Sequence, residues 1–155
     1  HETWNALVKL YEEGNAKSIG VSNYTIEHLE ERLEKTSIVP MVNQVEFSPF
    51  LYQKDLLEYC RKKDIQLIAY SPLTRTEKFD NPILHEIAEK HEKSPAQILI
   101  RWNIEHKVIP IPKSSSRKHI LENANVFDFK LEKEELKKLD SLNQDFRVVD
   151  DPIFN

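Results

Sequence analysis

The chain has 155 residues, of which 39% are apolar and 31% are charged, and its formal net charge at pH 7 is −4. This length is typical of one domain, and the apolar content is sufficient for a hydrophobic core, which excludes extensive disorder. The mild acidity argues against a general binder of nucleic acid or membrane surfaces, and no apolar run approaches the ~20 residues that a membrane span needs.

Apolar residues at helical spacing and short apolar runs alternate along the chain. In chain order the pattern predicts a helix carrying Trp4, Leu7, Val8 and Tyr11, a strand over 18–21, a helix from Thr25, a strand over 41–47, a helix over 53–63, a strand over 65–70, a polar loop over 74–80, helices from Pro82 and from Pro95 to about residue 106, a strand over 108–111, and helices over 116–125 and 132–143.

Several local signals support these boundaries. Gly14 is typical of a helix C-cap, and Thr25 of a helix N-cap. Ser94 followed by Pro95 and Gln97 has the spacing of a capping box with proline at the first helical position.

The helix over 116–125 is expected to bury Ile120, Leu121 and Ala124, and the last helix to bury Leu136 and Leu139.

Helices and strands alternate without a hairpin signal, which predicts parallel βα units. Right-handed crossovers would place the four strands side by side in chain order. We therefore expect an α/β fold equal to half of a (β/α)8 TIM barrel, with four parallel strands and outer helices over residues 1–146. Residues 147–155 are expected to form a C-terminal tail, with Ile153 and Phe154 docking on the surface or across a pocket mouth.

The single cysteine, Cys60, excludes an internal disulfide and is typical of a reducing cytosol. It lies on the apolar face of its helix with Leu56 and Leu57, so we expect a buried, unreactive thiol. The chain opens with a helical pattern and shows no signal peptide. A cytoplasmic location is therefore the expectation.

The predicted strands end in polar groups, which in a parallel barrel lie where ligands bind. Ser22 and Asn23 end the first strand, where they suit a ligand amide or, equally, cap the next helix. Gln44 closes the second strand, where it is either a contact to a ligand amide or a solvated strand terminus. Tyr70 closes the third strand, where its ring either stacks on a ligand or packs in the core.

A phosphate site is predicted after the last strand. Lys113 and Ser114 precede a helix, and a cation and a hydroxyl beside helix N-terminal amides bind anions. A solvated basic turn is the alternative, although Arg117, Lys118 and His119 add to the cluster in an otherwise acidic chain.

No metal site is expected. His85 and Glu86, with Glu89 and His91 after them, superficially resemble a zincin helix, which needs histidines at i and i+4. Position 89 is a glutamate, and the chain has no Cys-x-x-Cys. A nucleic-acid partner is also not expected, because the other basic residues are interspersed with acids.

Across residues 2–147 the sequence resembles the aldo-keto reductase family. The carrying segments are Glu2-Thr3-Trp4, Leu10-Tyr11-Glu12-Glu13-Gly14, Ile19-Gly20-Val21-Ser22-Asn23, Val42-Asn43-Gln44-Val45-Glu46-Phe47, Ala69-Tyr70-Ser71-Pro72-Leu73, Pro95-Ala96-Gln97 and Ile111-Pro112-Lys113-Ser114-Ser115. The family consists of TIM-barrel NADPH-dependent carbonyl reductases, and this chain resembles only the second half of the barrel.

The resemblance implies a cofactor role for eleven residues. Ser22, Asn23 and Gln44 would bind the nicotinamide carboxamide, Tyr70 would stack on its ring, Ser71 and Leu73 would touch the pyrophosphate, Lys113 and Ser114 would hold the 2′-phosphate, and Glu122 and Asn123 would contact adenine. His119 stands where the family commonly has an arginine that stacks on adenine and pairs with that phosphate. NADP is expected, with NAD as the less favoured alternative. Histidine is mostly neutral at pH 7, so His119 reduces the preference for NADP, and Arg117, two residues earlier, is the alternative cation for the phosphate.

The resemblance also implies the function and its limits. The chain would be the cofactor-binding half of an NADP-dependent reductase that converts small aldehydes or ketones to alcohols. The catalytic Asp, Tyr, Lys and His of the family have no matching position here, so we expect no catalytic residue and an inactive isolated chain. The expected partner is the missing N-terminal half or a second copy. The alternatives are an inactive half-barrel that serves as a binding or auxiliary module, and a fragment of a longer protein.

Overall fold

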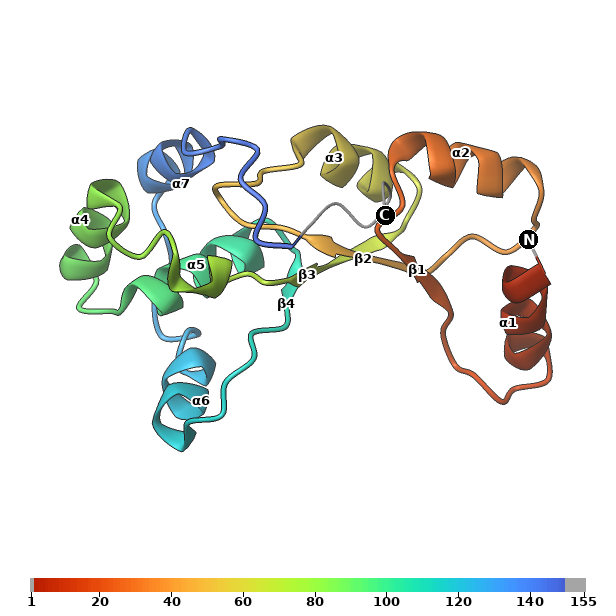
Figure 1. Ribbon diagram of the computed structural model, residues 1–155, viewed down its shortest axis with the longest axis horizontal. Helices are drawn as coiled ribbons and strands as arrows, with labels where there is room; N and C mark the ends of the chain where they lie inside the picture. The colour runs from red at the N-terminus through yellow and green to blue at the C-terminus, as the bar shows by residue number, and fades with distance from the viewer. Residues whose placement is uncertain (1, 150–155) are drawn as a thin grey trace. The chain divides into compact units, whose positions relative to one another are not determined.

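A computed structural model describes residues 2–149 of the chain (Figure 1). Its elements are α1 (Glu2–Glu12), β1 (Gly20–Ser22), α2 (Ile26–Glu34), β2 (Val42–Glu46), α3 (Lys54–Lys62), β3 (Gln66–Tyr70), the 3-10 turn η1 (Thr74–Thr76), α4 (Pro82–Lys90), α5 (Pro95–Glu105), β4 (Ile109–Pro110), α6 (Arg117–Ala124) and α7 (Lys133–Asp140). The sheet has the order β1-β2-β3-β4, with β1 parallel to β2 and β3 parallel to β4. The predicted series of parallel βα units is confirmed.

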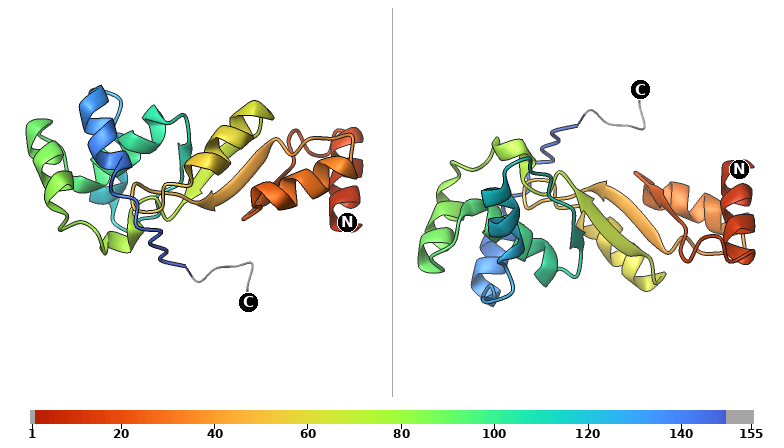
Figure 2. Two further views of the ribbon diagram at one scale, coloured as in Figure 1. Left: turned by 90° about the horizontal axis from the view of Figure 1, so that it is seen from above. Right: turned by 90° about the horizontal axis from the view of Figure 1, so that it is seen from below.

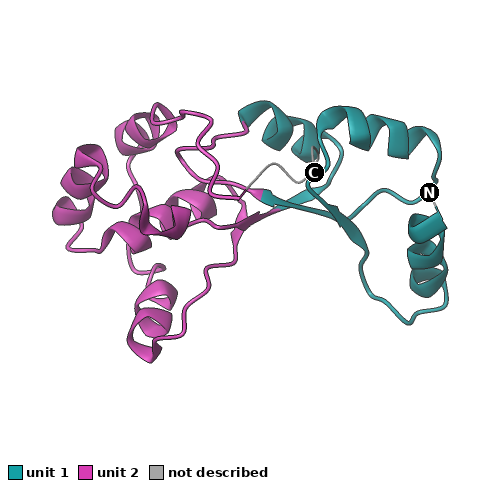
Figure 3. Ribbon diagram, in the orientation of Figure 1, with its two compact units in different colours: residues 1–45, 54–67 teal, residues 46–53, 68–155 magenta. Residues whose placement is uncertain are grey.

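The chain divides into two compact units (Figure 3). Unit 1 comprises residues 1–45 and 54–67, and unit 2 comprises residues 46–53 and 68–155. The predicted boundary between residues 146 and 147 stays a prediction.

In unit 1, α2 and α3 supply the apolar core. Leu29, Leu57 and Cys60 are buried there. Gly20 of β1 pairs with Val42 of β2, and a Cβ atom on Gly20 would lie 2.6 Å from the Val42 carbonyl oxygen. Only glycine fits this close approach of the two strands.

In unit 2, α4 packs against both α5 and α7, and α6 packs against α5 (Figure 2). Trp102 of α5 is fully buried and stacks on Phe47, with 5.2 Å between the ring centroids. Tyr52 meets Trp102 edge-on at 5.2 Å. Such aromatic pairs stabilise a core beyond their buried area.

The predicted helix starts are confirmed. Thr25 accepts a hydrogen bond from the backbone N–H of His28, and Ser94 accepts one from Gln97, each within a capping box. Asn81 caps α4, whose first residue is Pro82. The expected C-cap Gly14 has a φ of 75°, in the left-handed region that glycine adopts without strain.

The predicted inward face of α6 was wrong. Ile120 is 52% exposed and Leu121 is 61% exposed, Ala124 is exposed as well, and no residue of α6 is buried. The apolar spacing identified the helix correctly, but no other part of residues 2–149 covers this stripe.

Some element boundaries differ from those predicted. The stretch over 74–80 is not a purely polar loop, because it contains η1 and the buried Thr74. The last strand has two residues, Ile109 and Pro110, and α7 ends at Asp140 with Leu139 buried and Leu136 half-buried.

Of the tail, the structure describes residues up to 149, so the predicted docking of Ile153 and Phe154 lies outside the described residues. Among the described helices, none combines the length and the apolar character that crossing a membrane would require.

Candidate cofactor-binding residues

The three predicted amide-binding residues come together where β1 ends, beside the middle of β2. The prediction that Gln44 closes the second strand was wrong: Gln44 is the central residue of β2, and the strand continues to Glu46. Ser22 pairs in register with Gln44, and its hydroxyl donates to the Gln44 carbonyl oxygen at 2.9 Å. The backbone N–H of Asn23 donates to the same oxygen at 2.9 Å. Asn23 has a φ of 58°, a left-handed conformation that asparagine tolerates better than most residues. The end of β1 is thus held against β2 through the Gln44 carbonyl, without using the side-chain amides of Asn23 and Gln44.

The side-chain amides of Asn23 and Gln44 are half-buried, and within residues 2–149 neither has a hydrogen-bond partner. Each carries a donor and an acceptor, which is the set that a carboxamide ligand needs. The chemistry of these side chains therefore fits a carboxamide ligand, as the predicted nicotinamide contact requires.

The turn after β1 depends on Asn43, to which the sequence assigned no role of its own beyond its place beside Gln44 in a family segment. Asn43 is fully buried, its Nδ2 donates to the Tyr24 carbonyl at 2.8 Å, and its Oδ1 accepts from the Tyr24 N–H at 3.3 Å. The alternation of side chains along a strand could have indicated this role. Asn43 lies on the face of β2 opposite to Gln44, and a buried amide needs hydrogen-bond partners.

Cys60 lies beside Asn43 in the core of unit 1. Burial raises the pKa of the Cys60 thiol to about 11, and a hydrogen bond with Asn43 opposes part of that rise. The cysteine is free and fully buried. The predicted core thiol is confirmed.

In unit 2, β3 ends at Tyr70, which is half-buried, and the chain then turns through a strained loop. Ser71, Thr74, Arg75 and Thr76 all have φ between 47° and 71°, which is unusual for residues other than glycine. The hydroxyl of Thr74 is buried and has no hydrogen-bond partner among the described residues. Ser71 and Leu73, the two predicted pyrophosphate contacts, lie in this loop and are half-buried.

The predicted phosphate residues lie between β4 and α6. Lys113 is exposed, and the Ser114 hydroxyl accepts from the Ser116 N–H at 3.1 Å. Ser116 is the N-cap residue of α6, yet no side chain caps the helix. The uncapped N–H groups in the first turn of α6, together with the nearby cations, are suited to binding an anion.

The predicted adenine contacts lie on α6 itself. His119 is exposed, whereas Glu122 and Asn123 are half-buried. Gln97 of α5, which is buried, donates through Nε2 to the carbonyls of Glu122 at 3.1 Å and Asn125 at 2.7 Å. The sequence indicated Gln97 as part of a capping box and of a family segment, but not as a partner of α6, because the residues it binds lie 25 and 28 positions away.

His91, from the zincin-like segment, makes contacts that stabilise the fold. His91 lies 2.9 Å from Glu135 and packs against Phe129, with 5.2 Å between the ring centroids. Among residues 2–149, no group of three or more His, Cys, Asp or Glu residues is placed to hold a metal ion.

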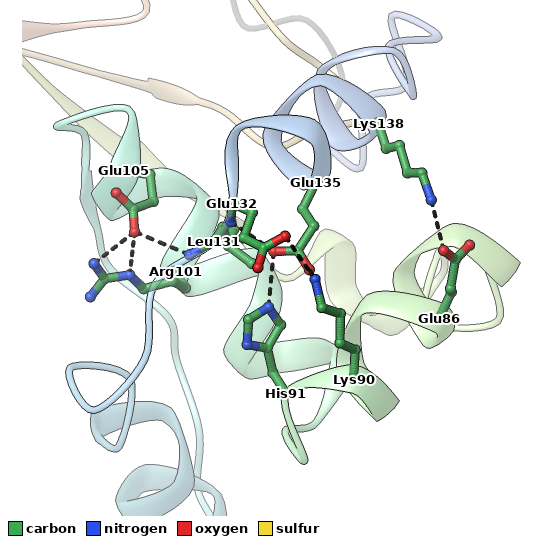
Figure 4. A network of polar contacts seen from close by, with 9 residues as sticks. All are labelled: Glu86, Lys90, His91, Arg101, Glu105, Leu131, Glu132, Glu135 and Lys138. Carbon is green, nitrogen blue, oxygen red and sulfur yellow. Dashed lines mark hydrogen bonds and ion pairs between the residues drawn. The ribbon is translucent and has the colours of Figure 1, made fainter.

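Glu135 is the centre of a polar network between α4 and α7 (Figure 4). Its carboxylate also lies 2.8 Å from Lys90 Nζ, as an ion pair rather than an aligned hydrogen bond, and accepts from the Glu132 N–H at 2.7 Å. Burial on its own would raise the pKa of Glu135, but contacts with Lys90, His91 and the Glu132 backbone lower it to about 2. This network orders unit 2 and contains none of the predicted site residues.

Comparison with known proteins assigns the family. The sequence model described as "Aldo/keto reductase family" matches residues 1–144. The chain belongs to the aldo/keto reductase family.

Curated relatives agree with this assignment. Glyoxal reductase of Bacillus subtilis (strain 168) is 52% identical over 151 residues, which cover 97% of this chain and 55% of the relative. Aldose reductase C of Dictyostelium discoideum is 45% identical over 149 residues, which cover 95% of this chain and 46% of the relative. The chain therefore spans about half the length of the curated relatives it matches.

Solved structures of aldo-keto reductases match the fold of this chain. An aldo-keto reductase from a Medee basin deep-sea metagenome library superposes with a TM-score of 0.92 at 43% identity, over 95% of this chain and 55% of the other. A Bombyx mori aldo-keto reductase in complex with NADP superposes with a TM-score of 0.90 at 35% identity, over 96% of this chain and 52% of the other. The four strands with their helices correspond to half of the aldo-keto reductase barrel, as predicted.

Proposed function

We propose that this chain supplies the NADP-binding residues of an aldo-keto reductase that reduces small aldehydes or ketones to alcohols. The observation that carries the proposal is a pair of side-chain amides, Asn23 after β1 and Gln44 within β2, which have no hydrogen-bond partner among residues 2–149 and stand on backbone that is already fixed. A site whose polar groups are held in place before the ligand arrives loses little freedom on binding. The bound cofactor supplies hydride chemistry.

Each set of residues has a separate role in this proposal. Ser22, Asn23 and Gln44 bind the carboxamide and fix the orientation of the nicotinamide. Tyr70 stacks on one face of the ring, so that only the other face is open to a carbonyl substrate.

The remaining residues bind the rest of the cofactor. Ser71 and Leu73 contact the pyrophosphate, and Lys113 and Ser114 hold the 2′-phosphate at the start of α6. His119, Glu122 and Asn123 contact the adenosine. The NADP bound to the Bombyx mori relative supports this choice over NAD.

The proton donor would come from outside residues 1–155, from an N-terminal half or a second copy of the chain. We place the reductase in the cytoplasm, where a free buried cysteine such as Cys60 is common. A small carbonyl compound is the proposed substrate, and a relative named glyoxal reductase supports a small aldehyde.

Cofactor titration by fluorescence tests the proposal in the complete polypeptide that carries this sequence. Gln44→Ala should weaken NADPH and NADH alike, because both contain the carboxamide. Lys113→Ala should weaken NADPH about tenfold, the size of one charge-assisted contact, and leave NADH nearly unchanged. His119→Arg should tighten NADPH by ~1–2 kcal/mol and leave NADH unchanged.

The control is Lys130→Ala, which removes one exposed positive charge elsewhere in unit 2. It should alter neither affinity. If Lys113→Ala and Lys130→Ala reduce NADPH affinity equally, the effect is one of net charge and the phosphate assignment fails.

A further inference from the structure

One peptide group in the turn between β1 and α2 is held from both sides (Figure 1). It joins Tyr24 to Thr25 and follows directly on Asn23. Its carbonyl accepts from Asn43 Nδ2 at 2.8 Å, and its N–H donates to Nδ1 of His28 at 3.4 Å. The turn that carries Asn23 thus has one anchor on β2 and a second anchor on α2.

The contacts of His28 fix which of its ring nitrogens carries the proton. The Thr25 N–H can only donate, so Nδ1 must accept, and the imidazole is neutral with its proton on Nε2. The Thr25 hydroxyl lies 3.0 Å from the same Nδ1, and its oxygen accepts from the His28 backbone N–H at 3.3 Å. These contacts complete a capping box at the start of α2. Glutamate or glutamine is usual at this position of the box, and neither loses its accepting oxygen near neutral pH.

Protonation of Nδ1 would turn the second anchor from an acceptor into a donor. The Thr25 N–H would lose its partner, and a positive charge would stand in the first turn of α2, where the helix dipole disfavours cations. Histidine is the ordinary side chain that changes its charge between about pH 8 and pH 5. The anchor on His28 is therefore present where the ring is neutral and is lost as the pH falls through this range.

Within residues 2–149, the ionisable groups that act on the His28 ring come from the turn and from α2. The Tyr24 ring is tilted against the imidazole, with 5.7 Å between the centroids, and its hydroxyl accepts from Arg32 Nη2 at 3.0 Å. Glu31 interacts electrostatically with His28, but it is exposed and forms an ion pair with Lys35 at 2.6 Å. A surface carboxylate that is already paired compensates little for a cation at the start of the helix.

We propose that His28 is a positioning residue: its neutral ring holds the turn in the conformation in which Asn23 meets the nicotinamide carboxamide, and its protonation releases that turn. Asn23 has a φ of 58°, a left-handed conformation that even asparagine adopts at some cost, so contacts on either side must keep it there. Affinity for any nicotinamide dinucleotide should then fall with pH through the histidine range, a consequence that rests on the proposed function.

Two variants separate the charge of His28 from its hydrogen bond. His28→Gln keeps an accepting oxygen at the usual capping-box position and does not titrate, whereas His28→Ala removes the acceptor at every pH. The control is His85→Gln, at an exposed histidine of α4. All measurements use the complete polypeptide that carries this sequence.

Nitrogen NMR and hydrogen exchange test the anchor without any cofactor. The neutral His28 ring should carry its proton on Nε2. Protection of the Thr25 amide, corrected for the intrinsic pH dependence of exchange, should fall about three- to tenfold between about pH 8 and pH 5 in the wild type and in His85→Gln, the size of one hydrogen bond between neutral groups. It should stay high in His28→Gln and low in His28→Ala. A neutral ring with its proton on Nδ1, or equal protection in wild type and His28→Ala at neutral pH, would overturn the anchor.

Titration with NADH tests the positioning role, because NADH has no 2′-phosphate that the charge of His119 could affect. The rise in Kd from about pH 8 to pH 5 should be about three- to tenfold larger in the wild type and in His85→Gln than in His28→Gln. Reduced Thr25 protection with an equal rise in all three would make His28 a helix cap alone and overturn its positioning role.

Should His28→Ala fail to fold, the wild type and His28→Gln decide both questions. A wild-type polypeptide that binds neither NADH nor NADPH would refute the proposed function, while the exchange result would still decide the anchor.

Discussion

The replacement of Asn43 by alanine tests whether one buried amide holds the turn that carries Ser22 and Asn23. In the structure Asn43 makes two hydrogen bonds with the backbone of Tyr24, at 2.8 and 3.3 Å. Each such bond contributes a net ~0.5–1.5 kcal/mol, and each buried backbone group left unpaired costs ~1–3 kcal/mol. Tyr24 is half-buried, so water can partly replace the lost partners. We expect Asn43→Ala to lower the free energy of unfolding by about 2–4 kcal/mol.

The assay is urea unfolding combined with hydrogen exchange at the Tyr24 amide. The matched control is the neighbouring residue: Gln44→Ala removes a half-buried amide that has no partner among residues 2–149, and should cost less than about 0.5 kcal/mol. Exchange at Tyr24 should accelerate in Asn43→Ala only. A stability loss below about 1 kcal/mol with unchanged Tyr24 exchange would refute the role given to Asn43.

The two variants also separate structure from binding. Gln44→Ala should weaken cofactor binding without destabilising the chain, because its amide is free for a ligand. Asn43→Ala should lower both the stability and the cofactor affinity, because it loosens the turn that positions Asn23. Equal cofactor affinity in wild type and Gln44→Ala would remove Gln44 from the proposed site.

Three further predictions concern buried polar groups. Glu135, whose pKa is lowered to about 2, contributes stability that is fully present above its ordinary pKa of 4.5 and is lost as pH falls through about 2. Glu135→Gln should therefore cost about 2–4 kcal/mol at pH 7 in urea unfolding, and its difference from the wild type should shrink toward pH 2. Gln97→Ala should cost about 1–3 kcal/mol and speed hydrogen exchange throughout α6, whose last carbonyls it binds. Cys60, with a pKa of about 11, should have a thiolate fraction of only ~10⁻⁴ at pH 7, so that a disulfide reagent labels it only after unfolding.

Each of these has an outcome that would contradict it. Glu86→Gln is the control for Glu135→Gln, because Glu86 is an exposed carboxylate paired with Lys138 at 2.7 Å. Its replacement should lower the free energy of unfolding by less than about 0.5 kcal/mol. Equal losses in the two glutamine variants would rule out a special role for Glu135. Unchanged exchange in α6 would argue against Gln97 as its tether, and rapid labelling of Cys60 in the native chain would contradict its burial.

The fold could be predicted from the sequence largely because its signals are local. Caps such as Thr25 and Ser94 act within three residues, and the strands are short apolar runs. The polar strand ends were visible for the same reason, so the candidate cofactor residues could be named before their surroundings were known.

The contacts of Asn43 and Glu46 could not be predicted, because their partners are distant in sequence. Asn43 reaches a partner 19 residues away, and Glu46 one that is 102 residues away. A buried glutamate and an exposed one look the same in a sequence. Only the structure shows which carboxylates meet backbone donors.

The exposed apolar residues near β4 lead to the last prediction. Ile109 is 49% exposed and Phe127 is 76% exposed, and both line an apolar groove of about 450 Å³. Apolar patches of this kind are typical of interaction surfaces. β4 pairs with β3 on one side and is the last strand in the order of the described sheet, so it is an edge strand there. A chain consisting of residues 1–155 alone should therefore associate and bind an apolar dye, and the double variant Ile109→Lys with Phe127→Ser should reduce both effects. Leu10→Lys, at a residue that is 43% exposed on α1, is the control and should change neither. Light scattering from a stable monomer that binds no dye would show that this surface needs no partner.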